Sequence, residues 1–203
     1  MDTTPDQMPW TITRWPPTPP IEPTERLPLI AEEPLSIRVQ GQPFVVVMRT
    51  PGHEKAHAAG LCLAEGVVDT PGEIVELALC DGPESNTVTV TLNAAAAKRF
   101  RSRAHRRAHI SQTGCGLCGK ELIEDLYRDL HPLPDGPPIS AAAARAGLMS
   151  LDQHQPLRAA TRAAHAAALY DRRAQPLIAI EDVGRHNALD KCIGRLFLDQ
   201  QLP

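Results

Sequence analysis

The stretch LIAIEDVGRHNALDKCIG, residues 177–194, places an apolar run directly before a polar turn and a helix-forming segment. The run Pro176 to Ile180 has the length and apolar character of a buried strand. A helix is predicted to follow from about Asn187, which is a residue type suited to an N-cap. A strand that leads straight into a helix is a building unit of α/β architectures. This strand–helix unit is therefore the first indication of an α/β fold.

Two predicted hairpins precede it. Residues 34–50 contain two β-rich runs around the turn Gln40-Gly41-Gln42. Residues 73–92 contain two more, separated by Asp81-Gly82-Pro83. A short helix that ends near Gly66 is predicted between the hairpins. Hairpins first and strand–helix units later indicate a mixed α/β (α+β) fold.

Three further helices are predicted in the second half of the chain. Residues 120–130 carry an apolar stripe at helical spacing. Residues 139–153 and 157–172 are rich in alanine, and each is predicted to form a helix. The second of these helices contains small residues that favour tight packing.

Length and composition suggest a single folded domain. The chain has 203 residues and a net charge of -3, so neither nucleic acid nor a membrane is an expected partner. Residues 1–29 are rich in proline without an apolar period and are predicted to be a disordered lead-in. Residues 30–203 are predicted to form the domain, divided into a β-rich part (30–110) and an α/β core (111–203).

Targeting signals are not evident. The N-terminal segment lacks the apolar centre of a signal peptide, and no apolar run approaches the roughly 18 residues that span a bilayer. The cytoplasm is therefore the expected location. Five cysteines, an odd number, fit reduced thiols better than a disulfide framework.

The segment TGCGLCGKE contains two cysteines, Cys115 and Cys118, flanked by glycines. Glycines let backbone N–H groups approach the sulfurs. The predicted helix after the loop and the cation of Lys120 both favour the thiolate, which is the nucleophilic form. The loop is thus suited to a reactive thiol.

Metal and redox alternatives remain open for this loop. A zinc site would need further ligands, for which His105 and His109 are the nearest candidates. A thioredoxin-like pair would follow a strand, whereas this pair follows a polar and basic segment. The zinc-deaminase pattern H-x-E followed by P-C-x-x-C is absent. The segment HEKAH, from His53 to His57, matches H-E-x-x-H formally, but a solvated first helical turn explains it better.

The turn after the predicted strand at 176–180 concentrates polar side chains. Glu181 and Asp182 come first, and Arg185, His186 and Asn187 follow. Ligands of open α/β sheets bind at the carboxyl ends of strands, and an arginine beside a helix N-terminus suits a phosphate. A simple capped helix with a solvated loop is the alternative. His165 stands alone in an alanine-rich segment, where a packing or capping role is the simpler interpretation.

Several motifs together resemble the FdhD/NarQ family of formate dehydrogenase accessory sulfurtransferases. They are EEPLSIRVQGQPFVVVMRTPG, AEGVV, TGCGLCGKE, HAAALYD and EDVGRHNALDKCIG, in that order between Glu32 and Leu198. The resemblance implies a cytidine-deaminase-like three-layer fold without the deaminase zinc site. It also implies that family members continue beyond the last of these motifs, so that this chain is a C-terminally shortened member with an open sheet edge and exposed apolar faces.

The resemblance further implies a function. A family member takes persulfide sulfur from a cysteine desulfurase and passes it to the molybdenum bis-guanine dinucleotide cofactor, which is then inserted into formate dehydrogenase. Cys115 would carry the persulfide and Cys118 would support transfer. Asp182, Arg185, His186, Asn187 and His165 would contact the cofactor, including its GDP-like end. A homodimer is the expected assembly.

One family pattern is altered in this chain. Where the family has T-G-G-x-H, this chain has Thr161-Arg162-Ala163-Ala164-His165. Arg162 would be able to contact a phosphate in place of the glycine. Two other functions therefore stay open beside sulfur transfer: a degenerate, non-catalytic binding module, and a small zinc-binding protein.

Overall fold

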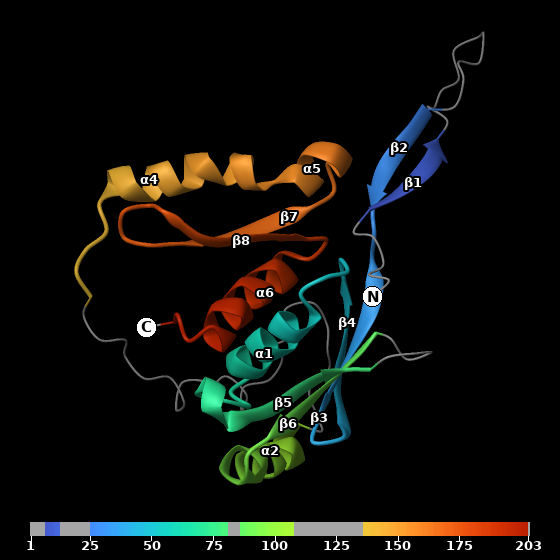
Figure 1. The fold of residues 1–203 in the computed structure, drawn as a ribbon, viewed down its shortest axis with the longest axis vertical. Coiled ribbons are helices and arrows are strands. Elements are labelled where there is room, and N and C mark those ends of the chain that lie inside the picture. The colour runs from blue at the N-terminus through green and yellow to red at the C-terminus, as the bar shows by residue number, and fades with distance from the viewer. Residues whose placement is uncertain (1–6, 13–24, 81–85, 108–135, 203) are drawn as a thin grey trace.

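The computed structural model describes residues 7–12, 25–80, 86–107 and 136–202 (Figure 1). Strands β1 (Gln7–Ile12) and β2 (Glu25–Ile30) pair antiparallel. Both lie largely within the segment for which the sequence predicts disorder, so part of that segment is paired strand in the structure. The predicted division of the chain at residue 30 remains a prediction.

The central sheet has four strands in the order β4-β3-β6-β5. They are β3 (Glu33–Val39), β4 (Gln42–Arg49), β5 (Ile74–Leu79) and β6 (Thr87–Leu92). Both predicted hairpins are confirmed as antiparallel pairs, and β3 pairs parallel with β6. The predicted helix between the hairpins is α1 (Glu54–Ala64), which is part of the long connection between the parallel strands β3 and β6.

One face of this sheet forms the hydrophobic core. Its fully or nearly fully buried side chains alternate along the strands, as period-2 patterning requires: Leu35, Ile37, Val39, Val88, Val90 and Leu92. Small residues of α1 and of α2 (Ala94–Arg107) pack on them together with Phe100. Asn93 caps α2, because its side-chain oxygen accepts the N–H of Ala96 at 3.0 Å.

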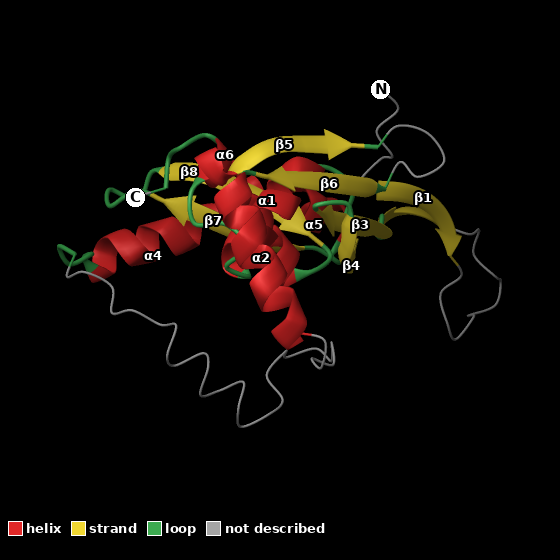
Figure 2. Ribbon diagram, turned by 90° about the horizontal axis from the view of Figure 1, so that it is seen from below, coloured by secondary structure: helices red, strands yellow, loops and turns green. Residues whose placement is uncertain are grey.

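Helix α6 packs the second half of the chain against the first half (Figures 1 and 2). Strands β7 (His165–Tyr170) and β8 (Pro176–Asp182) form an antiparallel hairpin. Helices α1 and α6 (Arg185–Leu198) lie between this hairpin and the four-stranded sheet, and α4 (Ala141–Ser150) and α5 (Pro156–Thr161) lie beyond the hairpin. None of the helices in the described ranges is long and apolar enough to cross a membrane. The predicted mixed α/β class is confirmed.

Two sequence-based boundaries are wrong. The single helix predicted over residues 157–172 is in fact α5, a turn and β7. Arg162 ends α5 in the left-handed conformation (φ 57°), and the alanines that follow pair with β8 instead of continuing the helix. Tertiary packing here overrides the helix propensity of alanine. Helix α6 begins two residues before Asn187, with Gly184 as its N-cap.

Of the two other predicted helices, one lies within the described residues and one does not. The helix predicted at residues 139–153 is confirmed as α4 and the short turn of 3-10 helix after it, Leu151–His154. The helix predicted at 120–130 lies outside the described residues. A second short 3-10 helix, Pro71–Glu73, leads into β5.

Helices α1 and α6 cross with their backbones in contact. A Cβ atom on Gly60 of α1 would overlap the carbonyl oxygen of Asp190 in α6. A Cβ atom on Gly194 of α6 would overlap the carbonyl oxygen of Ala56 in α1. This close approach fixes the position of α6, and with it the turn from β8, relative to the first half of the chain.

Candidate functional site

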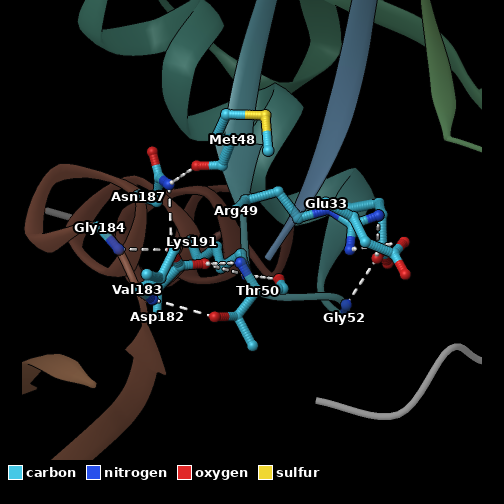
Figure 3. Close-up of polar contacts among 11 residues, drawn as sticks. Glu33, Met48, Arg49, Thr50, Gly52, Asp182, Val183, Gly184, Asn187 and Lys191 are labelled. Carbon is cyan, nitrogen blue, oxygen red and sulfur yellow. Dashed lines mark hydrogen bonds and ion pairs between the residues drawn. The ribbon is translucent and has the colours of Figure 1, made fainter. Parts of the chain in front are cut away.

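Asp182, the last residue of β8, lies at the centre of a buried polar cluster (Figure 3). Its carboxylate is 0% exposed and pairs with Lys191 of α6, which is 1% exposed, at 2.6 Å between Oδ2 and Nζ. Lys191 also donates to the carbonyl oxygen of Thr50 at 2.7 Å. Burial lowers the pKa of Lys191, and the charge of Asp182 opposes that effect. Both charges need these partners, because an isolated buried charge is very costly.

The same cluster covers part of the outer edge of β4 (Figure 3). Asp182 Oδ2 accepts the backbone N–H of Thr50 at 3.1 Å. Asn187 Nδ2 donates to the carbonyl oxygen of Met48 at 2.7 Å and to Asp182 Oδ1 at 3.0 Å. These backbone groups are ones that a neighbouring strand would otherwise satisfy. We call Asp182, Asn187 and Lys191 the clasp, because they join β8 and α6 to the end of β4.

The turn between β8 and α6 is held by the same residues. The N–H of Val183 donates to Thr50 Oγ1 at 3.0 Å, and the N–H of Gly184 donates to Asp182 Oδ1 at 2.8 Å. No side chain caps the N-terminus of α6. The turn is thus rigidly placed, while the first N–H groups of the helix keep their attraction for an anion.

Three of the predicted site residues lie on the surface at this end of the hairpin. Arg185 and His186 form the first two residues of α6, and both are exposed. His165 is exposed as well and stands opposite Asp182 in the β7–β8 ladder. The structure therefore brings residues from two strand ends to one place. Their positive or titratable side chains, with the helix N-terminus, suit an anionic group such as a phosphate.

The clasp gives Asp182 and Asn187 a structural role in this fold. Both were predicted to contact a cofactor, and that prediction remains untested. In the structure the carboxylate of Asp182 receives the hydrogen bonds of four donors, and the amide of Asn187 spans two acceptors. The partner Thr50 lies 132 residues away from Asp182 in the chain. No local pattern in the sequence indicates this pairing.

A second buried network adjoins the clasp and was missed by the sequence reasoning. Arg49 is 2% exposed and contacts Asn86 at 3.0 Å, Glu54 at 3.2 Å and Glu33 at 4.0 Å. Its Nε and Nη1 atoms are buried without hydrogen-bond partners. Glu54 also accepts the N–H of Gly52 at 2.6 Å. The charged pair Arg49 and Glu54 thus fixes the turn from β4 into α1.

His57 of α1 is fully buried, and neither ring nitrogen has a hydrogen-bond partner among the described residues. Burial, followed by the nearby charge of Lys191, lowers the pKa of His57 to about 4. The imidazole is therefore neutral at pH 7. His53 and His57 belong to the formal H-E-x-x-H match, but within the described ranges no group of three or more His, Cys, Asp or Glu side chains is placed to hold a metal ion.

Two of the described cysteines, Cys62 and Cys192, are unsuited to nucleophilic chemistry. Burial raises the pKa of Cys62 to about 12 and that of Cys192 to about 11. The thiol of Cys192 donates to the carbonyl oxygen of Ala167 at 3.3 Å. Cys80, the third described cysteine, is half-buried. Cys115 and Cys118 lie outside the described residues, as does His109, and the side chain of His105 is not described.

The fold and this cluster define a mixed α/β protein in which a strand–turn–helix unit is joined to the edge of a four-stranded sheet. The same fold occurs in a solved structure named as that of a formate dehydrogenase accessory protein from Desulfotalea psychrophila, with a TM-score of 0.70. The two chains are 20% identical, and the match covers 97% of this chain and 71% of the other. At that identity the likeness establishes the fold.

The chain belongs to the FdhD/NarQ family, whose model matches residues 30–202. The sulfur carrier protein FdhD of Variovorax paradoxus is 38% identical over 165 residues, which are 81% of this chain and 59% of the relative. The protein of that name from Anaeromyxobacter dehalogenans is 38% identical over 168 residues, which are 80% of this chain and 58% of the relative. The chain thus spans about three fifths of the length of these relatives. The predicted family is confirmed.

Proposed function

We propose that this protein is a sulfur carrier that serves formate dehydrogenase. The observation that carries the proposal is the family match over residues 30–202, together with relatives named sulfur carrier protein FdhD. Two of the three described thiols are poor candidates, because Cys62 and Cys192 are buried and have raised pKa values, and Cys80 stands apart from any second cysteine in the sequence. Cys115 and Cys118 are therefore the candidates for the sulfur-bearing thiols.

The proposed reaction begins with the thiolate of Cys115. It attacks the outer sulfur of a persulfide on a cysteine desulfurase, which forms a new S–S bond on Cys115 and releases the thiolate of the desulfurase. The thiolate of Cys118 then attacks the inner sulfur of the Cys115 persulfide, which forms a Cys115–Cys118 disulfide and releases the outer sulfur as sulfide to the molybdenum bis-guanine dinucleotide cofactor. A dithiol reductant would return both cysteines to thiols. A thiolate rather than a thiol is required for the first step.

The surface at the start of α6 is the proposed place for the phosphate groups of that cofactor, which is a substrate of the reaction. Arg185 would pair with a phosphate through its planar fork, and the helix N-terminus would add its dipole. His186, the next residue of α6, and His165, opposite Asp182 in the ladder, would add further contacts. The clasp would hold this surface in place, and Asp182 and Asn187 are proposed to contact the substrate beside it.

Sulfur loading provides the direct test. The full chain is incubated with a cysteine desulfurase and cysteine, and its intact mass is recorded before and after a thiol reductant. We expect a reductant-labile gain of one sulfur that maps to Cys115 and disappears in Cys115→Ala. Cys80→Ala is the matched control, since Cys80 is the least buried of the described cysteines. Undiminished loading of Cys115→Ala would refute the proposed carrier residue.

A binding module that no longer transfers sulfur is the second candidate. Arg162 favours it, because an exposed arginine stands where the family pattern has a glycine. Titration with GDP separates substrate binding from sulfur transfer. Binding that weakens in Arg185→Ala, combined with sulfur loading, supports the carrier; GDP binding without loading favours the module.

The proposed partners are a cysteine desulfurase and formate dehydrogenase. Co-purification of the full chain with each of them separately tests these two contacts. A homodimer is the proposed assembly.

A further inference from the structure

Strand β5 is the outermost strand of the four-stranded sheet on the side opposite to β4 (Figure 2). Val75 is 66% exposed and Leu79 is 39% exposed. Val75 has no partner in β6, because the register of the β5–β6 ladder shifts between Ile74 and Glu76. Proteins normally cover or protect such an edge, since its free N–H and C=O groups template further pairing.

The free backbone groups of β5 belong to Leu77 and Leu79. Cys80 donates its N–H to the carbonyl oxygen of Thr87, next to β6, at 2.9 Å. Because successive residues of an antiparallel strand direct their backbone groups to opposite sides, those of Leu77 and Leu79 point away from β6. Val90, which stands opposite Leu77, accordingly turns its carbonyl oxygen to the other side of β6, where it accepts an N–H at 2.9 Å. In the part of the chain that the structure describes, no strand pairs with these outward groups.

An open hollow of about 310 Å³ adjoins this edge, between the start of β5 and the end of α6. Most of the residues that line it are apolar, and one carries a carboxylate. The lining includes Pro71, Ile74, Val75, Glu76, Leu77 and Leu198. When an extended peptide adds a strand to a sheet edge, main-chain hydrogen bonds hold it and pockets receive its side chains. The edge of β5 offers both features side by side.

Glu76 supplies the charge that selects the occupant. Its side chain is exposed and pairs with no cation among the described residues, whereas Glu73 is paired with Arg99 at 2.8 Å. A lysine or arginine on an added strand would complement Glu76. A second copy of β5 would not, because antiparallel pairing about the middle of the strand brings Glu76 close to its own equivalent.

We propose that the free edge of β5 and the adjoining hollow bind an extended segment of another protein, with an apolar side chain in the hollow and a lysine or arginine beside Glu76. The segment pairs with the outward backbone groups of Leu77 and Leu79 and extends the sheet by one strand. The clasp lies at the opposite edge of the sheet, so the docked segment leaves the surface at Arg185 accessible. Docking at β5 and sulfur transfer can therefore each fail without the other.

Selection from a displayed library of random peptides tests the chemistry of the occupant. The full chain is expected to enrich peptides in which a lysine or arginine stands close to an apolar residue. Glu76→Lys is expected to enrich peptides with an acidic residue in that place instead. Asp152→Lys makes the same charge change at an exposed position in the turn after α4, and this control should enrich the same peptides as the unmodified chain.

The most enriched basic peptide then serves as the probe for affinity, measured by fluorescence anisotropy. We expect binding at least about tenfold weaker in Glu76→Lys, because like charges repel, and in Leu79→Pro, because the outward N–H is lost while the ladder with β6 keeps its hydrogen bonds. The peptide is also expected to slow hydrogen exchange at the amides of Leu77 and Leu79.

Three outcomes overturn the proposal. The first is that the library yields no peptide that binds the unmodified chain. The second is a basic peptide whose affinity is unchanged in both Glu76→Lys and Leu79→Pro, with circular dichroism showing that both variants are folded. The third is a peptide that slows exchange at amides of β4 and not at those of β5.

Discussion

At the scale of single residues, Asp182 and Lys191 are expected to contribute unequally to stability. Asp182→Ala leaves Lys191 charged and buried with one remaining acceptor, and it strands the N–H groups of Thr50 and Gly184. We expect a loss of about 3–5 kcal/mol of unfolding free energy. Lys191→Met leaves the carboxylate with three donors, so a smaller loss of about 2 kcal/mol is expected.

Urea unfolding of the two variants measures this difference. Lys191→Arg is a useful control, because it keeps the charge while changing its shape. Equal losses for Asp182→Ala and Lys191→Met would mean that the other three donors to Asp182 contribute little.

His57 predicts a dependence of stability on acid. In the unfolded chain its pKa is about 6.5, and in the folded chain burial and Lys191 lower the pKa to about 4. Between these values the unfolded state binds more protons, so the contribution of His57 is complete above pH 6.5 and is lost as pH falls toward 4. The full effect corresponds to about 3 kcal/mol.

His57→Leu removes this titration and the two unpaired nitrogens at similar volume. We expect urea midpoints at pH 7 that are unchanged or higher, and a smaller decline from pH 6.5 to pH 4.5 than in the unmodified chain. Asp190, whose pKa burial raises to about 6, acts in the opposite sense in both proteins and therefore cancels in the comparison. Parallel pH profiles would show that folded His57 titrates normally.

The sequence indicates which residues are candidates for the site more readily than it indicates what each of them contacts. Arg185 and His186 follow the end of β8, and His165 stands opposite Asp182 in the β7–β8 ladder; their role as a site stays a prediction. The clasp was not predictable, because its contacts to Met48 and Thr50 span more than 130 positions. The residues next to Arg49 and His57 in the sequence do not indicate that these two side chains are buried.

At the scale of elements, the crossing of α1 and α6 is the feature most sensitive to added volume. Gly60→Ala is expected to destabilise the protein by about 3 kcal/mol or more, because the new methyl group meets the backbone of α6 and neither helix can yield locally. Gly194→Ala should behave alike. Gly72→Ala, where the new Cβ has open space, is the control and should change stability by less than about 0.5 kcal/mol.

Thermal unfolding of the three variants tests the crossing. A mild effect at both helical glycines would show that α1 and α6 separate at little cost. The double variant is expected to lose little more than either single one, because both methyl groups push the same two helices apart.

Strands and helices were predicted correctly where the pattern of apolar residues was strong. The prediction was wrong where the segment consists mainly of alanine. The β-rich runs of β3 and β6 and the apolar run of β8 identified strands correctly. The alanine-rich β7 was mistaken for helix, because alanine carries no β signal and its strand is selected by pairing with β8 and by packing on α6. Arg162, where the family pattern has glycine, takes the left-handed conformation that ends α5 before β7 begins.

At the scale of the whole molecule, the clasp and the α1–α6 crossing both link the two halves of the chain. The four-stranded sheet is built from residues before 93, and the β7–β8 hairpin with α6 from residues after 164. The hairpin has two strands, which is marginal without packing against a larger unit. We therefore expect the halves to unfold together.

Native-state hydrogen exchange tests this cooperativity. Amides of β4 and β8 are expected to exchange with equal opening free energies in the unmodified chain. Asn187→Ala, which removes the bond to the carbonyl oxygen of Met48 and one donor to Asp182, should lower both values by about 1–2 kcal/mol. Arg195→Ala, which removes an exposed ion pair with Asp199, is the control and should leave both almost unchanged. If β8 opens at a much lower free energy than β4 before any substitution, the clasp does not couple the halves, and the surface at Arg185 rests on a unit that moves independently of the sheet.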